Sequence, residues 1–154
     1  MSDRRQLWLD ILTLVCSLGA GVVYLYASLD KIQHPAAFAQ AIANYRMVPL
    51  PLLHTFAWLL PIAEAVVGAA LIVGWQRRGA ALLASLMTVM FIIAIASALI
   101  RGLDISCGCF DTAAGSSVGM DLLLRDIVLL AACLVPLMVA RDRWSLDAWL
   151  ARRA

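Results

Sequence analysis

The chain has 154 residues, of which 64% are hydrophobic and only 14% are charged, and its mean hydropathy is +0.91. An average soluble domain has about a quarter of its residues charged, so this composition excludes a soluble enzyme, a disordered chain and a nucleic-acid-binding protein. The formal net charge of +2 is also too small to indicate polyanion binding. We therefore expect an all-α integral membrane protein with a single membrane domain over residues 1–154.

Four apolar stretches predict a four-transmembrane-helix bundle, since about 20 apolar residues cross the hydrocarbon core as a helix. They lie at about residues 8–29, 54–75, 79–100 and 122–140. The first has no small-residue cleavage site and is expected to be an uncleaved span. The fourth contains Arg125 near its start, so it spans only if this side chain reaches the interface or meets a partner inside the bundle.

Lys and Arg are distributed unevenly between the two sides of the predicted bundle. Eight fall on one side, at Arg4, Arg5, Arg77, Arg78, Arg141, Arg143, Arg152 and Arg153. Only three, Lys31, Arg46 and Arg101, fall on the other side. The positive-inside rule then predicts cytoplasmic termini, outer loops at 30–53 and 101–121, and a cytoplasmic tail at 141–154.

Two short helices are expected outside the spans. One opens at Pro35 in the first outer loop, where Phe38, Ile42 and Tyr45 would share a face. The other lies in the tail, with Ser145 as its N-cap. Both have the amphipathic pattern typical of helices that lie along a membrane interface.

Cys107 and Cys109 form a Cys-Gly-Cys motif in the second outer loop, which the orientation places in an oxidising compartment. Bridged Cα atoms normally lie about 4.4 to 6.8 Å apart, so this pair can bridge only across a tight turn, which Gly108 permits. Such a bridge closes almost no loop and adds little stability. Strained, exposed disulfides exchange readily, so the pair is a candidate working disulfide.

Other interpretations of the cysteines stay open. Cys107 and Cys109 could be inert thiols, or they could bind a soft metal such as Cu(I). A closed zinc site needs four ligands, and the loop has no His, although His34 or His54 could contribute. We predict no metal site. The remaining two cysteines, Cys16 and Cys133, are expected to be small buried hydrophobes, with a second redox pair as the alternative.

Three charged residues lie within the predicted spans. Glu64 is near the middle of the second span, where a carboxyl group must be neutral or paired. Arg125 and Asp126 lie one turn below the outer end of the fourth, and Arg125 could extend toward Glu64. These residues either form an ion pair that fixes helix register or line a polar cofactor pocket.

Several short motifs occur together in one order along the chain. They are Leu29-Asp30-Lys31, Pro35-Ala36-Ala37-Phe38, Tyr45-Arg46-Met47-Val48-Pro49, Pro61-Ile62-Ala63-Glu64, Gly68, Cys107-Gly108-Cys109-Phe110 and Leu124-Arg125-Asp126. In this order the chain closely resembles the methylamine utilisation protein E (MauE) family, within the wider DoxX-like group of four-helix membrane proteins. The resemblance covers roughly Val15 to Leu134.

The resemblance implies a four-helix bundle in the bacterial inner membrane. It also implies thiol–disulfide chemistry on periplasmic proteins, including the maturation of disulfide-rich dehydrogenase subunits. By position it implies that Cys107 and Cys109 are the redox pair. The candidate cofactor-binding residues are Tyr45, Arg46, Glu64, Arg125 and Asp126.

The chain departs from the family pattern at two positions. Asp111 stands where the pattern often has Gly, and Asp126 stands where an Asn is usual. Both departures add negative charge near the site, which is expected to raise a thiol pKa and slow thiolate attack.

We therefore expect a membrane thiol–disulfide oxidoreductase that acts on a periplasmic thioredoxin-like protein or a cysteine-rich client. By fold-level analogy with quinone-linked disulfide-forming membrane proteins, its electrons would pass to a membrane quinone, with Arg125 or Tyr45 bonding a quinone oxygen. The alternative is a non-enzymatic accessory or assembly subunit of a larger membrane complex. Small residues such as Gly68 and Ala84 would then pack its helices.

Overall fold

Five α-helices and one short 3₁₀ helix form the part of the chain that the structure, a computed structural model, describes: residues 2–102 and 120–139. In chain order they are α1 (Ser2–Gln33), α2 (Pro35–Asn44), η1 (Leu50–Leu52), α3 (Leu53–Val73), α4 (Arg77–Ile100) and α5 (Met120–Met138). Within these ranges there is no strand, as the composition predicts. The expected tail helix lies outside the described residues.

Three of these helices, α1, α3 and α4, are long and apolar enough to cross a membrane. The fourth predicted span is also a helix, α5, with 19 residues. Asp121, Arg125 and Asp126 all fall within it, so by composition it is not among the three. The described chain is therefore a membrane-type helical protein with three clear candidate spans and a fourth, more polar helix.

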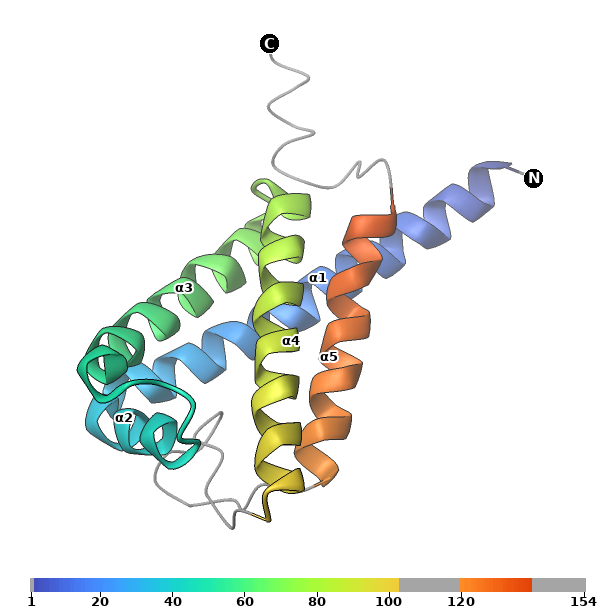
Figure 1. Cartoon of the computed structure of the whole chain (residues 1–154). Coiled ribbons are helices and arrows are strands. Elements are labelled where there is room, and N and C mark those ends of the chain that lie inside the picture. The colour runs from blue at the N-terminus through green and yellow to red at the C-terminus, as the bar shows by residue number, and fades with distance from the viewer. Residues whose placement is uncertain (1, 103–119, 140–154) are drawn as a thin grey trace.

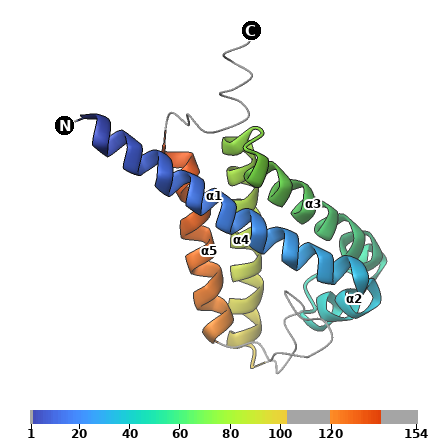
Figure 2. The same cartoon turned by 180° about the vertical axis from the view of Figure 1, so that it is seen from behind.

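Helix α1 is longer than the predicted first span at both ends. Its 32 residues correspond to about 48 Å at about 1.5 Å per residue, more than the hydrocarbon core of about 30 Å. The helix crosses α4 and α5 obliquely, and its N-terminal part projects beyond the bundle (Figures 1 and 2). At the other end it continues past Leu29 to Gln33, which brings Lys31 into the helix.

The helices associate as two main pairs, α1 with α3 and α4 with α5, and α1 also contacts α5. Helix α2 lies across the end of the bundle where α3 begins, and it packs on α3 (Figure 1). It opens at Pro35, as predicted, and buries Phe38 and Ala41. Pro fits the first turn of a helix because its missing N–H would have no intrahelical partner there.

Glycine allows α1 and α3 to approach backbone to backbone. A Cβ atom added to Gly68 would lie 2.9 Å from the carbonyl oxygen of Gly21, and one added to Gly21 would lie 2.8 Å from that of Gly68. Those distances are too short for any larger residue without movement of the helices. This crossing therefore sets the separation of α1 and α3.

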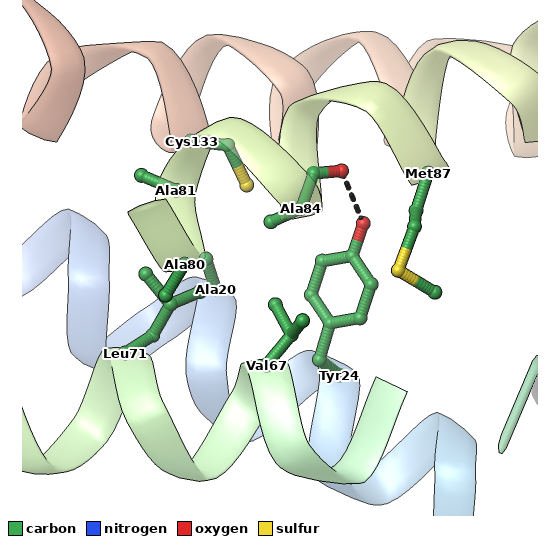
Figure 3. Packing of buried hydrophobic residues seen from close by; sticks show 9 residues of the cluster. All are labelled: Ala20, Tyr24, Val67, Leu71, Ala80, Ala81, Ala84, Met87 and Cys133. Carbon is green, nitrogen blue, oxygen red and sulfur yellow. Dashed lines mark hydrogen bonds between the residues drawn. The ribbon is translucent and has the colours of Figure 1, made fainter. Parts of the chain in front are cut away.

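The centre of the bundle is built mainly from small side chains. The cluster in Figure 3 contains Ala20, Tyr24, Val67, Leu71, Ala80, Ala81, Ala84, Met87 and Cys133. Its one large polar member, Tyr24 of α1, donates a hydrogen bond from its hydroxyl to the Ala84 carbonyl oxygen of α4 at 2.7 Å. The same hydroxyl lies 2.6 Å from Thr88 Oγ1, so a buried polar link joins α1 to α4.

Candidate functional site

The predicted redox pair, Cys107 and Cys109, lies outside the described residues. The described chain stops at Gly102 after α4 and resumes at Met120, where α5 begins. Both of these positions are at the end of the bundle that carries α2 (Figure 1). The candidate site is therefore built from the described side chains at this end.

An ion pair between Lys31 of α1 and Glu64 of α3 lies at the centre of this site. Lys31 Nζ donates to both carboxylate oxygens of Glu64, at 2.6 and 2.8 Å, and each side chain is only 1% exposed. We expected Glu64 to be neutral or paired, and named Arg125 as the partner within reach. The partner is Lys31, because α1 continues as a helix beyond its apolar stretch.

Two phenyl rings flank the Lys31 ammonium group. Nζ is 5.2 Å from the ring centroid of Phe38 in α2 and 5.1 Å from that of Phe91 in α4. Cations are attracted to the negative faces of aromatic rings at such distances, more strongly where water is excluded. Lys31 thus brings α1, α2, α3 and α4 together at one buried point.

Arg125 and Asp126 of α5 form a second charged pair. Arg125 Nη2 lies 3.3 Å from Asp126 Oδ1, and the Asp126 side chain is buried whereas that of Arg125 is partly exposed. A cavity of about 20 Å³ lies between this pair and Lys31–Glu64, and Tyr24 and Thr88 also line it. A polar cavity of this volume is large enough for about one water molecule. Three predicted residues, Glu64, Arg125 and Asp126, therefore meet around one small polar space.

Sequence reasoning missed Lys31 as a site residue and counted it among the charges of the outer loop. A pattern in α1 indicates the true position of Lys31, because the buried polar residues of this helix recur along one face. Asp10, Ser17, Tyr24 and Lys31 are seven residues apart, and Thr13 lies between the first two on the same face. Residues seven apart lie on the same side of a helix, so the stripe marks the face that α1 turns to the bundle.

The other two predicted residues, Tyr45 and Arg46, lie just after α2. Tyr45 is partly buried, and its carbonyl oxygen accepts a hydrogen bond from Arg101 Nη1 at 2.9 Å. Burial raises the pKa of the Tyr45 phenol to about 12, so it is a neutral hydrogen-bond donor at ordinary pH. Arg46 is exposed, has a φ of 53°, and lines neither this small cavity nor the larger one described next.

A larger apolar cavity of about 480 Å³ lies beside the ion pair. Its walls come from α2, α3, α4 and the segment after α2, and they include Phe38, Tyr45, Phe56 and Phe91. Phe38 and Phe91 thus separate the cavity from the Lys31 ammonium group. Its volume is in the range of small-molecule sites in proteins, about 300 to 1,000 Å³.

The described residues also show the surroundings of two cysteines and of His34. Cys133 is buried in the central cluster and Cys16 is half-buried, and neither is bridged. His34 bonds to the Asp30 backbone oxygen within its own turn. Over residues 2–102 and 120–139, no group of three or more His, Cys, Asp or Glu side chains comes together in a metal-binding arrangement.

The family model and the curated relatives that match this chain agree on one family. The family model described as "Methylamine utilisation protein MauE" matches residues 9–139. The chain is 32% identical over 114 residues to the methylamine utilization protein MauE of Paracoccus denitrificans, covering 73% of this chain and 61% of that protein. It is 35% identical over 115 residues to the MauE protein of Methylophilus methylotrophus, covering 73% of this chain and 60% of that one.

The chain therefore spans about three fifths of the length of these curated relatives. No solved structure matches it significantly. The family match covers most of the chain, including the Lys31–Glu64 pair and the residues that line both cavities. On this basis the chain belongs to the methylamine utilisation protein MauE family.

Proposed function

We propose that this protein is a membrane thiol–disulfide oxidoreductase that serves methylamine utilisation by acting on a periplasmic thioredoxin-like protein or a cysteine-rich client. The observation that carries the proposal is the Cys-Gly-Cys motif in the connection between α4 and α5. This connection leaves and rejoins the bundle at the end that holds the buried charges and the aromatic cavity. A reactive cysteine pair in this connection would be accessible to a client protein and would also lie near the membrane part of the bundle.

The proposed exchange conserves electrons and protons at each step. A client thiolate attacks the Cys107–Cys109 disulfide and forms a mixed disulfide, and the second client thiolate then releases the oxidised client. The client is oxidised by two electrons and the Cys107–Cys109 pair is reduced to two thiols. The pair returns to the disulfide when two electrons and two protons pass to a membrane quinone.

The proposed location is the bacterial inner membrane, with four spans and cytoplasmic termini. Moving Lys31 from the outer loop into the bundle strengthens the charge asymmetry, because Arg46 and Arg101 then remain on the outer side against eight arginines on the inner side. The buried Asp126 supports α5 as the fourth span, since its charge faces other helices rather than lipid. The motif would then face the periplasm.

A protein with only the two motif cysteines gives the cleanest test. The Cys16→Ala/Cys133→Ala variant retains Cys107 and Cys109 as its sole thiols. After purification in oxidising buffer, it should show no alkylatable thiol until a reduced periplasmic thioredoxin-like protein is added, and then two thiols per chain. If Cys107 and Cys109 are alkylated from the start, the proposed oxidising mechanism is wrong.

A second candidate function is that of a non-enzymatic assembly subunit. The N-terminal part of α1 favours it, because this part of the helix projects from the bundle (Figure 2). Its apolar side chains, including Trp8 and Leu12, are exposed. The Cys107→Ser/Cys109→Ser variant separates the two functions. In Paracoccus denitrificans lacking its own MauE, growth on methylamine with this variant supports the assembly subunit, and loss of growth supports the oxidoreductase.

A further inference from the structure

The large cavity is unusual within this chain for its aromatic walls. The chain has four phenylalanines and three tyrosines, and the cavity takes three of the former and one of the latter: Phe38, Phe56, Phe91 and Tyr45. They come from α2, α3, α4 and the segment after α2, so they converge from separate elements. The central cluster, by contrast, consists mainly of alanine and other small residues (Figure 3).

Aromatic walls favour a flat ring over a flexible chain. Rings stack or meet edge to face with other rings, and such pairs stabilise beyond the apolar area that they bury. Met47 and Met90 add polarizable thioethers, which also contact rings favourably and adapt to the shape of a ligand. An acyl chain would gain only apolar contact from these four side chains, whereas a flat ring would gain the ring–ring interaction as well.

Tyr45 provides a polar group in this cavity. Among the described residues that line it, Tyr45 alone has a hydroxyl group, and this hydroxyl makes no hydrogen bond to any residue that the structure describes. The phenol is neutral at ordinary pH, so its hydroxyl can donate to an acceptor atom on a ligand. The other polar groups of this region, Lys31 and Glu64, satisfy each other behind Phe38 and Phe91.

The cavity is also accessible from the lipid-facing surface of the bundle. Several of its lining residues, including Leu86, Met90 and Ile93, are exposed apolar side chains of α4. In a membrane this opening faces the hydrocarbon region, so a ligand would enter from the bilayer. A ligand that enters from the bilayer must be lipid-soluble, and a ring with a hydrogen-bond acceptor would match the Tyr45 hydroxyl.

We propose that this cavity binds the ring of a membrane quinone, with the phenyl rings of α2, α3 and α4 against the quinone ring and the Tyr45 hydroxyl donating to a quinone oxygen. The choice of a quinone among flat lipid-soluble rings rests on the proposed oxidoreductase function, which needs an acceptor of two electrons in the bilayer. The existence of a binding site rests on the cavity alone. The experiment below distinguishes failure of the site from failure of the oxidoreductase function.

The experiment uses the purified full chain in detergent and a photoreactive azidobenzoquinone with a decyl chain. Illumination should label peptides from α2 and α4, and excess decylbenzoquinone should protect them. The matching alkane, which has the chain without the ring, should not protect. If the alkane protects as well as the quinone does, the cavity is an acyl-chain site and the proposal is wrong.

Two variants test whether the labelling occurs in the cavity. Ala94→Trp fills the space from α4, and we expect labelling to fall by about tenfold or more. Leu83→Trp is the matched control, because Leu83 is an exposed residue of the same helix outside the cavity lining. It should be labelled as the wild type is. Equal labelling of both variants would put the quinone elsewhere.

Two milder substitutions keep the proposal testable if Ala94→Trp does not fold. Phe56→Leu removes one ring but keeps an apolar wall, and it should weaken decylbenzoquinone without weakening the alkane. Tyr45→Phe should weaken decylbenzoquinone by about fivefold, as expected for one hydrogen bond. It should not change the affinity for decylbenzene, which has no oxygen. If neither substitution changes the affinity for decylbenzoquinone, the proposed pose is wrong.

The Cys107→Ser/Cys109→Ser variant distinguishes failure of the site from failure of the function. Its cavity is intact, so we expect it to be labelled and protected like the wild type. If the wild type is labelled selectively but Cys107 and Cys109 do not exchange with the thioredoxin-like protein, the quinone site stands and the proposed oxidoreductase function is wrong. If Cys107 and Cys109 exchange but the quinone label is not selective, the oxidoreductase function stands and the quinone site is wrong.

Discussion

Helix α3 meets its two long neighbours in opposite ways. On the α1 side, Gly68 faces Gly21 so closely that neither position has room for a Cβ atom. On the α4 side, near α2, large side chains including Phe56 and Phe91 surround a cavity of about 480 Å³. Helix α3 is therefore close-packed against α1, whereas its interface with α4 is packed at the central cluster and open near α2.

The difference shows how residue size determines helix separation where the surroundings are lipid. Water does not drive apolar helices together there, so close packing and buried polar contacts hold them. The α1–α3 interface has both, in its glycines and in Lys31–Glu64. We infer that α1 and α3 form the rigid frame, and that the α3–α4 side is the part that can accept a ligand.

Breaking the ion pair should have the largest effect on this frame. Lys31→Met leaves the Glu64 carboxylate buried without a partner, and loss of one member of a buried pair costs about 3–5 kcal/mol of unfolding free energy. Unfolding in detergent, followed by circular dichroism, measures the loss. Lys31→Met/Glu64→Met should recover most of it, because apolar residues of similar volume often replace such pairs at little cost.

The double variant also provides the control for this prediction. If it is as unstable as Lys31→Met, the loss comes from Lys31 packing against Phe38 and Phe91 rather than from the unpaired carboxylate. A cost below about 1 kcal/mol for the single variant, a value typical of exposed pairs, would show that the pair does not hold α1 to α3.

Enlarging the glycine contact should have a smaller effect. In Gly68→Ala the new methyl group would lie 2.9 Å from the Gly21 carbonyl oxygen and 3.1 Å from Leu25, so the helices must separate, at about 1–3 kcal/mol. Gly19→Ala is the matched control on α1, because a Cβ atom there meets nothing within 4 Å. It should be neutral or stabilise by up to about 1 kcal/mol, as Ala favours a helix over Gly. Equal effects in both variants would mean that the crossing is not close-packed.

The helical architecture could be predicted from the sequence because it depends on apolar segment length alone. That rule places helices near 54–75 and 79–100, and the structure has α3 and α4 there. It fails at the end of α1, because charged residues were taken to end a span. Asp30 and Lys31 continue the helix instead, since Lys31 finds its counter-ion inside the bundle.

The site could be predicted only in part for the same physical reason. Glu64 and Asp126 stand out as charges among apolar residues, and both lie on the small polar cavity. Asp126 pairs with the adjacent Arg125, whereas the partner of Glu64 is Lys31 of another helix. Which helix faces meet decides that second pair, and no pattern within one segment contains that information. The aromatic cavity is harder still, because Phe38, Phe56 and Phe91 are far apart in the chain and each looks like an ordinary apolar residue.

The smallest predicted effect concerns the polar link that joins Tyr24 of the α1–α3 frame to α4. Tyr24→Phe removes the hydroxyl that bonds to Ala84 O, but Thr88 Oγ1 still donates to the same carbonyl at 2.9 Å, so no buried acceptor is left without a partner. The cost should be about 0.5–1.5 kcal/mol, the usual net contribution of one hydrogen bond. Thr88→Val should cost a similar amount, because Tyr24 then satisfies the Ala84 carbonyl alone. A double-mutant cycle on unfolding free energies measures their coupling. If either single substitution costs as much unfolding free energy as Lys31→Met, then α4 belongs to the rigid frame. The α1 and α4 interfaces of α3 would then not differ in strength.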